Sequence, residues 1–216
     1  DINAYDEGRL GEYNFEVRQA GYARFIDDAF DIGSLSPAQI LPLLYNCFHD
    51  MEDDDLSVRT NGASAITETV RAFKDQDADE TWPKGGLVPS YVIPMLKGGL
   101  KKTDEVVRDQ FVRLLGTTVR LVPTLYPDML CLTNDDDPEI DVLNNMVHIQ
   151  LHRRIRSLSK LKSTIESGDI TPSSMTGFVI PMVTHYVYAK SVTITKGGTR
   201  GGKDVVKQGG HNMVAG

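Results

Sequence analysis

The sequence contains little cysteine, few aromatic residues and no long apolar run. Its two cysteines, Cys47 and Cys131, lie in apolar surroundings, which predicts reduced core thiols of an intracellular protein rather than a disulfide framework. Aromatic residues make up only 7% of the chain, with Trp82 as the single tryptophan. No stretch approaches the roughly 20 apolar residues of a transmembrane helix, and no signal-peptide pattern is present. We therefore expect neither secretion nor contact with a membrane.

A complete nucleotide-binding motif is also missing. The run Gly197–Lys203 approaches the spacing of a P-loop, but Asp204 follows the lysine where the loop needs Ser or Thr to bind Mg²⁺. The segment after it ends in two glycines, whereas a P-loop leads into a helix that faces the phosphates. The sequence predicts no nucleotide site here, and no enzyme.

Metal-binding motifs are equally incomplete. The acidic runs 50–55 and 135–141 lack the glycine that an EF-hand loop has at its sixth position, and are typical of turns that lead into helix N-termini. His148 and His152 have the spacing of a helical zinc pair, but Ile149 stands where a metalloprotease has glutamate. The sequence predicts no metal and no cofactor.

Charge is distributed unevenly along the chain, whose net charge is −7. Residues 1–141 carry 13 basic and 27 acidic side chains, whereas residues 142–216 carry 10 basic and 3 acidic ones. This asymmetry favours contact between an anionic partner and the C-terminal third. The alternative is that the charges of a short sequence are unevenly distributed without functional meaning.

A repeat is visible in two segments that lie 49 residues apart, Asp55–Arg59 and Asp104–Arg108, both with the pattern Asp-x-x-Val-Arg. The aspartate is expected to cap a helix N-terminus, where it bonds free amides and complements the helix dipole. Apolar residues follow both segments at the same offsets, with the spacing of one helix face. They are Ala63, Ile66 and Val70 in the first copy and Val112, Leu115 and Val119 in the second.

Each of these helices is preceded by a more apolar, proline-containing one, expected over 37–48 and 88–96. Proline is tolerated in the first turn of a helix and distorts the helix further in. A distorted first helix, a short turn and an Asp-x-x-Val-Arg second helix are typical of a HEAT repeat.

Two further units and an N-terminal helix complete the expected fold. The third unit has a long helix from about 139 to 166, and the fourth starts with Thr171 as N-cap and runs to about 188. A helix over about 12–30 completes the N-terminal end. In the long helix we expect a core stripe made of Leu151, Ile155, Leu158, Leu161 and Ile165.

The predicted fold class is therefore all-α, a HEAT-like α-solenoid of about four helical-hairpin units over residues 1–188. Residues 189–211 are expected to form a glycine-rich flexible insertion. Residues 212–216 are expected to start a truncated next helix. Because the chain does not begin with Met, we expect it to be an internal fragment of a longer protein.

The long helix carries a basic face, which is the candidate binding site for RNA or another partner. Arginine suits phosphate because its planar fork donates two hydrogen bonds at once. The alternative is that these side chains pair with acidic turns of neighbouring units and hold the stack together. The candidate residues are His152, Arg153, Arg154, Arg156 and Lys160.

One stretch of this region resembles a known family. Asp137–Asp141, followed by Asn144–Leu161, is similar to a motif of the DRIM ("down-regulated in metastasis") family, which has acidic-Pro-Glu, Asn-Met, His-Ile-Gln and a basic helix that begins His-Arg-Arg. The resemblance extends to Tyr13–Gly21, to the two Asp-x-x-Val-Arg helices and to Phe178–Met182.

The resemblance implies a very large helical solenoid of the nucleus and nucleolus. Such a protein is a noncatalytic scaffold of the small-subunit processome and supports processing of the 18S ribosomal RNA precursor and early ribosome assembly. The implied partners are processome proteins, the ribosomal RNA precursor and its guide small nucleolar RNA, with direct RNA contact left open. The alternative function is a HEAT-repeat transport adaptor, which should present acidic residues and tryptophans to its protein cargo.

Overall fold

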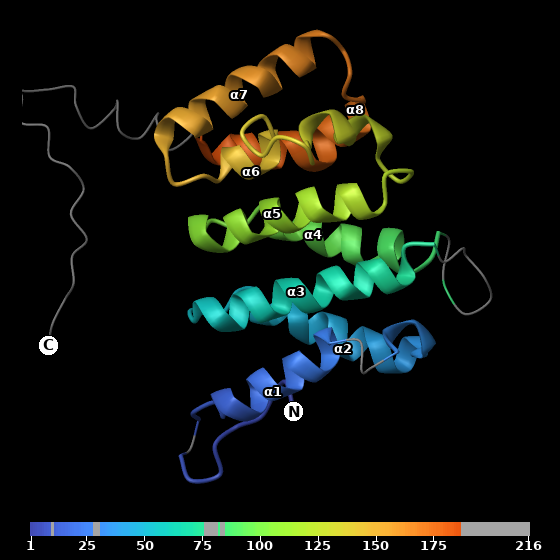
Figure 1. Cartoon of the computed structure of the whole chain (residues 1–216), viewed down its shortest axis with the longest axis vertical. Coiled ribbons are helices and arrows are strands. Elements are labelled where there is room, and N and C mark those ends of the chain that lie inside the picture. Colours follow the sequence, from blue (N-terminus) through green and yellow to red (C-terminus); the bar gives the residue numbers. More distant parts are fainter. Residues whose placement is uncertain (10, 28–30, 76–81, 83–84, 187–216) are drawn as a thin grey trace, which may run out of the picture.

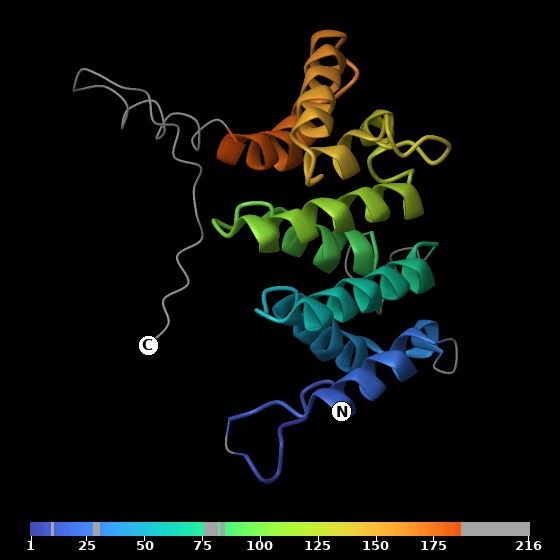
Figure 2. The same cartoon turned by 60° about the vertical axis from the view of Figure 1, so that its left-hand side comes forward.

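Helices stacked in layers make up the part of the chain that the structure describes (Figure 1; Figure 2). The computed structural model describes residues 1–9, 11–27, 31–75, 82 and 85–186. Extended pairing in these residues is limited to one isolated bridge between Tyr5 and Tyr13, so the predicted all-α class is confirmed. The predicted segments 189–211 and 212–216 lie outside the described residues, as does the P-loop-like run.

The layers follow the order of the chain along the long axis of Figure 1, with α1 at one end and α7 and α8 at the other. Helix α3 packs against α1, α2 and α5, and α5 packs in turn against α4 and α6. None of the described helices has the length and apolar character needed to cross a bilayer. The helices are α1 (Phe15–Ile26), α2 (Pro37–Asp50), α3 (Leu56–Phe73), α4 (Ile93–Gly99), α5 (Glu105–Leu121), α6 (Val142–Met146), α7 (Leu151–Glu166) and α8 (Pro172–Ser174), with shorter turns η1 (Ile32–Ser34), η2 (Val88–Val92), η3 (Pro127–Leu132) and η4 (Met175–Val179).

The predicted aspartate caps are confirmed at the start of both repeated helices. Asp55 accepts hydrogen bonds from the backbone N–H groups of Ser57 and Val58 at 2.7 and 3.2 Å. Asp104 accepts one from Val107 at 3.0 Å. These bonds satisfy amides that have no partner inside the helix.

The arginine of each repeated pattern closes the turn that precedes its helix. Arg59 Nη1 donates to the backbone carbonyl oxygens of Asp53 and Asp54 at 2.6 and 2.8 Å. Arg108 Nη1 bonds the corresponding carbonyls of its own turn at 3.1 and 3.3 Å. Both arginines are buried, so the guanidinium replaces water on these carbonyls and fixes the turn between paired helices.

Prolines distort two of the first helices in the same way. A π-helical turn, η2 or η4, stands directly before an Ile-Pro-Met sequence that contains Pro94 or Pro181. In each, the backbone N–H of the isoleucine after the turn donates to the carbonyl oxygen of the residue five positions earlier. Proline has no N–H and cannot continue the ordinary ladder, and the wider turn accommodates the missing bond. After η4 the helix continues to Tyr186, and Thr171 is its N-cap as predicted.

The predicted long helix over about 139–166 is wrong, because the chain breaks between α6 and α7. His148 Nδ1 accepts a hydrogen bond from the backbone N–H of Gln150 at 3.0 Å, and the His148 N–H bonds the carbonyl of Asn145 at 3.3 Å. Local bonds of this kind compete with the helical ladder. The break lets α7 run in a different direction from α5 (Figure 2).

The predicted core stripe on this helix is also largely wrong. Leu161 is buried and Leu158 is half-buried against the core, but Leu151 and Ile155 are 63% and 56% exposed and Ile165 is exposed as well. The described residues therefore leave most of the apolar face of α7 uncovered.

The prediction that both cysteines are core thiols is correct for Cys47, which is buried, and wrong for Cys131, which is exposed.

Gly99 allows a close approach between α4 and α5. A Cβ atom at this position would lie 2.0 Å from the ring of Phe111, which is itself buried against Phe48. The neighbouring Gly98 has open space around it. The glycine therefore sets how closely this helical pair can pack.

We expect Gly99→Ala to lower the free energy of unfolding by about 1–3 kcal/mol, because the Phe111 ring must move within a packed core. Gly98→Ala, one residue away, is the matched control and should stabilise the helix by about 0.5–1 kcal/mol. Urea unfolding of both variants measures the difference. Equal stabilities would contradict the tight approach.

Candidate partner-binding surface around helix α7

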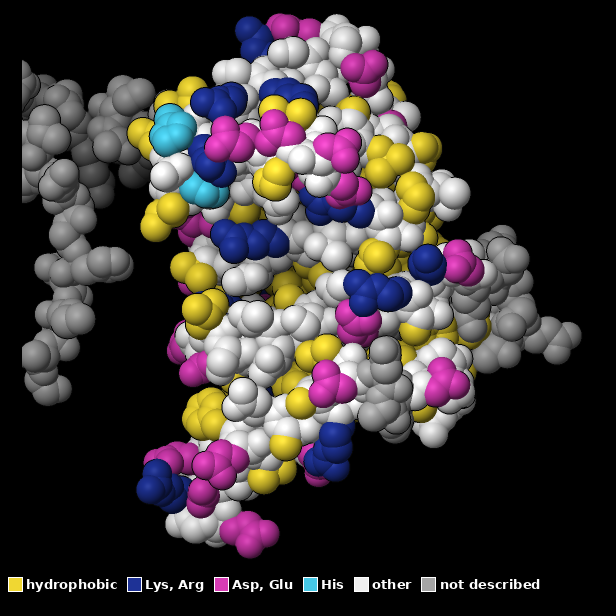
Figure 3. Space-filling view, in the orientation of Figure 1, with side chains coloured by type: hydrophobic (Ala, Val, Ile, Leu, Met, Phe, Trp, Pro, Cys, Tyr) yellow, Lys and Arg dark blue, Asp and Glu magenta, His cyan; other side chains and the backbone are white. Residues whose placement is uncertain are grey.

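Helix α7 lies at the C-terminal end of the stack, where its N-terminal turn is open to solvent. Figure 3 shows histidine, basic and hydrophobic side chains together at this end. Ile149, just before the helix, is 91% exposed. His148 precedes the helix, so His148 and His152 do not form the helical pair that the spacing suggested. The surface thus combines cationic groups with uncovered apolar ones.

Three of the five predicted site residues form ion pairs with acidic side chains of other elements. Arg153 and Arg156 reach the two carboxylate oxygens of Glu139 at 2.7 and 3.6 Å. Arg154 lies 3.6 Å from Glu105, at the start of α5. Glu139 therefore ties α7 to the acidic loop before α6, and Glu105 ties it to the preceding layer.

The remaining two differ in how far they are covered. Lys160 Nζ donates to the carbonyl oxygen of Ile140 at 3.2 Å, whereas His152 is exposed at the first turn. Among the arginines, the side chain of Arg156 is 60% exposed, against 26% for Arg153 and 32% for Arg154. The structure brings all five to one end of the stack, but only His152 and Arg156 are largely accessible.

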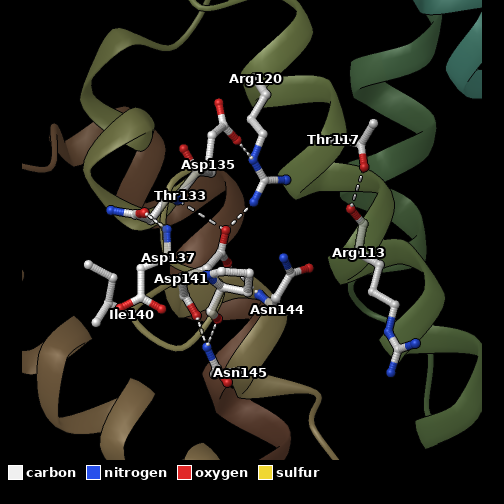
Figure 4. Close-up of polar contacts among 12 residues, drawn as sticks. Arg113, Thr117, Arg120, Thr133, Asp135, Asp137, Ile140, Asp141, Asn144 and Asn145 are labelled. Atoms are coloured by element: carbon white, nitrogen blue, oxygen red, sulfur yellow. Dashed lines mark hydrogen bonds and ion pairs between the residues drawn. The ribbon is translucent and has the colours of Figure 1, made fainter.

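A buried carboxylate, Asp141, holds the loop that carries Glu139 (Figure 4). One of its oxygens caps α6 by accepting the Asn144 N–H at 2.7 Å. The other accepts from Arg120 of α5 and from the Asn134 N–H at 3.1 Å. Arg120 also pairs with Asp135 at 2.7 Å. Because Asp141 is fully buried, the loop is fixed to α5 by a charge-assisted contact.

Asn145 completes this loop with bonds that match those of the repeated arginines. Its side-chain amide donates to the carbonyl oxygens of Pro138 and Asp141, both at 2.6 Å. The pair Asp141 and Asn145 has the same four-residue separation as the ends of Asp55–Arg59 and Asp104–Arg108. Sequence reasoning missed this third copy because asparagine replaces arginine.

A second acidic group, Asp109 of α5, lies in the junction between α5 and α7. Burial, with repulsion from Glu105, raises the pKa of Asp109 to about 6, against the opposing charges of Arg108, Arg113 and Arg154. Its Oδ1 has no hydrogen-bond partner among the described residues. An unsatisfied buried carboxylate favours its neutral form.

Two other kinds of functional group were considered from the sequence, namely an exposed tryptophan and a cluster of metal ligands. Trp82 is buried in edge-to-face contact with Phe73 and Tyr91, so it cannot belong to an exposed cargo-binding face. Within the described ranges, no three His, Cys, Asp or Glu side chains are grouped so as to hold a metal ion.

Comparison with known proteins confirms the resemblance that the sequence indicated. A family model described as "U3 small nucleolar RNA-associated protein 20, N-terminal", which is the DRIM family, matches residues 1–104. A protein of Saccharomyces cerevisiae named U3 small nucleolar RNA-associated protein 20 is 28% identical over 193 residues, 88% of this chain. Its namesake in Schizosaccharomyces pombe is 27% identical over 189 residues, 86% of this chain. The chain spans only 8% of the length of either relative.

We expect Asp141→Asn to lower the free energy of unfolding by about 3 kcal/mol, since it removes the buried one of the two carboxylates that pair with Arg120. Asp136→Asn, an exposed carboxylate of the same loop, should change it by less than about 0.5 kcal/mol. Chemical denaturation monitored by circular dichroism compares the two. Similar losses in both variants would mean that Asp141 does not anchor the loop.

The raised pKa of Asp109 predicts a pH-dependent contribution to stability. The native carboxyl binds its proton below about pH 6, whereas the unfolded one does so below about 3.8, so the cost of burying the charge falls as pH drops from 7 towards 4. Asp109→Asn should therefore stabilise the protein relative to wild type at pH 7, with the advantage shrinking towards pH 4. Denaturation at several pH values measures this difference, and an advantage independent of pH would contradict it.

Proposed function

We propose that this chain is a segment of a HEAT-like α-solenoid that serves as a noncatalytic scaffold of the nucleolar small-subunit processome. The observation that carries the proposal is the similarity, over most of the chain, to two proteins named for association with U3 small nucleolar RNA. In this role the protein acts in the nucleus and nucleolus and supports processing of the 18S ribosomal RNA precursor and early ribosome assembly.

The layered helices support the solenoid part of the proposal. Successive layers contact their neighbours in chain order, and each of three turns is closed by an aspartate cap with a donor four residues later. Recurrence of one local device at successive layers is what a repeat architecture requires. A solenoid has a long surface relative to its volume, which suits a scaffold that follows a large ribonucleoprotein.

The end of the stack at α7 is the proposed contact surface for RNA or a processome protein. Arg156 and His152 form its accessible part, and Arg153, Arg154 and Lys160 lie behind them against Glu139, Glu105 and Ile140. Contacts to phosphate through such groups supply salt-dependent affinity without reading sequence. The shape of the surface, and not the base sequence, would then determine where on the RNA it binds.

We expect Arg156→Glu to reduce ultraviolet crosslinks between the full-length protein and precursor ribosomal RNA by about threefold or more in cells, because an accessible cation becomes an anion beside phosphate. Arg156 is preferred to Arg153 and Arg154 because its side chain is the most exposed of the three and its contact with Glu139 is longer than that of Arg153. Lys162→Glu makes the same charge change on another face of α7, at a side chain that is 75% exposed, and should leave crosslinks unchanged.

Protein abundance must be equal in the three samples for this comparison. Unchanged crosslinks in Arg156→Glu would assign the basic face to pairing within the protein. Absence of any ribosomal precursor or guide RNA from the wild-type crosslinks would contradict the scaffold function itself.

A further inference from the structure

We propose that the turns α2–α3 and α4–α5 form a docking edge for a basic peptide segment of a protein partner, in which arginine or lysine alternates with leucine-like residues. This edge, called the acidic edge below, lies at the N-terminal ends of α3 and α5. It borders the basic face of α7, because Glu105, next to Asp104, pairs with Arg154. Its residues are Glu52, Asp53, Asp54, Leu56, Asp104 and Val106.

A cavity separates the two turns and gives the edge a place to hold a side chain. Its volume is about 510 Å³, and its walls include Asp53, Asp54, Asp104 and Val106. That volume falls within the roughly 300–1,000 Å³ of clefts that bind small ligands. The cavity can therefore receive one or two side chains of an extended peptide.

The charge of this cavity selects a cationic occupant. Lys102 is paired with Glu52 at 2.5 Å, so those two charges cancel each other. Asp53 and Asp104 accept only backbone N–H groups in the contacts that the structure describes, which leaves their negative charge uncompensated by a cation. Asp54 is exposed beside them. A field of this sign attracts basic peptides and repels nucleic acid.

The guanidinium of Arg59 offsets part of this negative charge, but four carboxylates and two cations line the cavity, so its net charge stays negative. The residue is only 9% exposed and donates to carbonyls of its own turn.

Exposed apolar side chains stand next to the carboxylates on the same edge. Leu56 and Val106, in the first turns of α3 and α5, are 60% and 54% exposed. In Figure 3 hydrophobic and acidic side chains lie together where these helices begin. Leucine-like residues of the peptide would cover Leu56 and Val106 while its cations meet the aspartates. The two kinds of contact together distinguish this edge from an ordinary solvated turn.

Binding of short labelled peptides to the chain, followed by fluorescence anisotropy, tests the proposal. A peptide that alternates arginine with leucine should bind saturably, with affinity falling as salt rises, whereas its glutamate–leucine counterpart should not bind. Asp54→Lys should weaken binding about fivefold or more, because an attractive charge becomes repulsive. Asp136→Lys makes the same change in the acidic turn before α6 and should have no effect.

A second pair of matched variants tests the apolar contribution to peptide binding. Val106→Ser should weaken binding, and Ile180→Ser, at an isoleucine that is 47% exposed on the last helix, should not. Absence of saturable binding by the arginine–leucine peptide, or equal losses in Asp54→Lys and Asp136→Lys, would overturn the proposal. Single-stranded RNA that binds wild type and binds less well to Val106→Ser would also overturn it, by assigning the edge to nucleic acid.

Discussion

The start of each second helix is the constraint on which the stack depends. A helix N-terminus leaves backbone amides without partners, and the turn before it leaves carbonyls in the same state. Asp55, Asp104 and Asp141 satisfy the amides. Arg59, Arg108 and Asn145 satisfy the carbonyls from four residues further on. A turn closed in this way fixes the angle at which two helices meet, and the apolar faces can then pack in a single register.

The last layer uses the same device but adds charge between elements. Asp141 is bonded to Arg120, and the loop that it fixes offers Glu139 to two arginines of α7. Arg153 and Arg156 therefore stabilise the fold through Glu139. Only the side chain that stays exposed can also bind a partner. This pairing explains why a helix with a strongly basic sequence presents only part of its charge to solvent.

Short-range features of the fold could be predicted from the sequence. The caps at Asp55 and Asp104 depend on residues two or three positions away, and the stripe Ile66 and Val70 is buried as its spacing indicated. Periodicity also identified an apolar face on α7, but it could not tell what that face meets. Leu151 is exposed because the chain breaks at His148, and that break depends on a side-chain bond with no clear sequence signal.

The candidate site could be located from the sequence but not interpreted from it. All five basic residues lie at one end of the stack, as their spacing on a helix required. Their partners are Glu139, fourteen residues from Arg153, and Glu105, which belongs to another layer. Contacts over such separations depend on how the layers are placed, which a single sequence does not encode in any local pattern. The acidic edge was missed for the same reason, because its two turns are about fifty residues apart.

The bonds that close the turns join residues no more than seven positions apart. They lie inside one layer and do not cross to the next. A change in the angle between two layers would therefore leave these bonds intact and act on the contacts between the layers. Such a stack can change curvature by small increments shared among many interfaces.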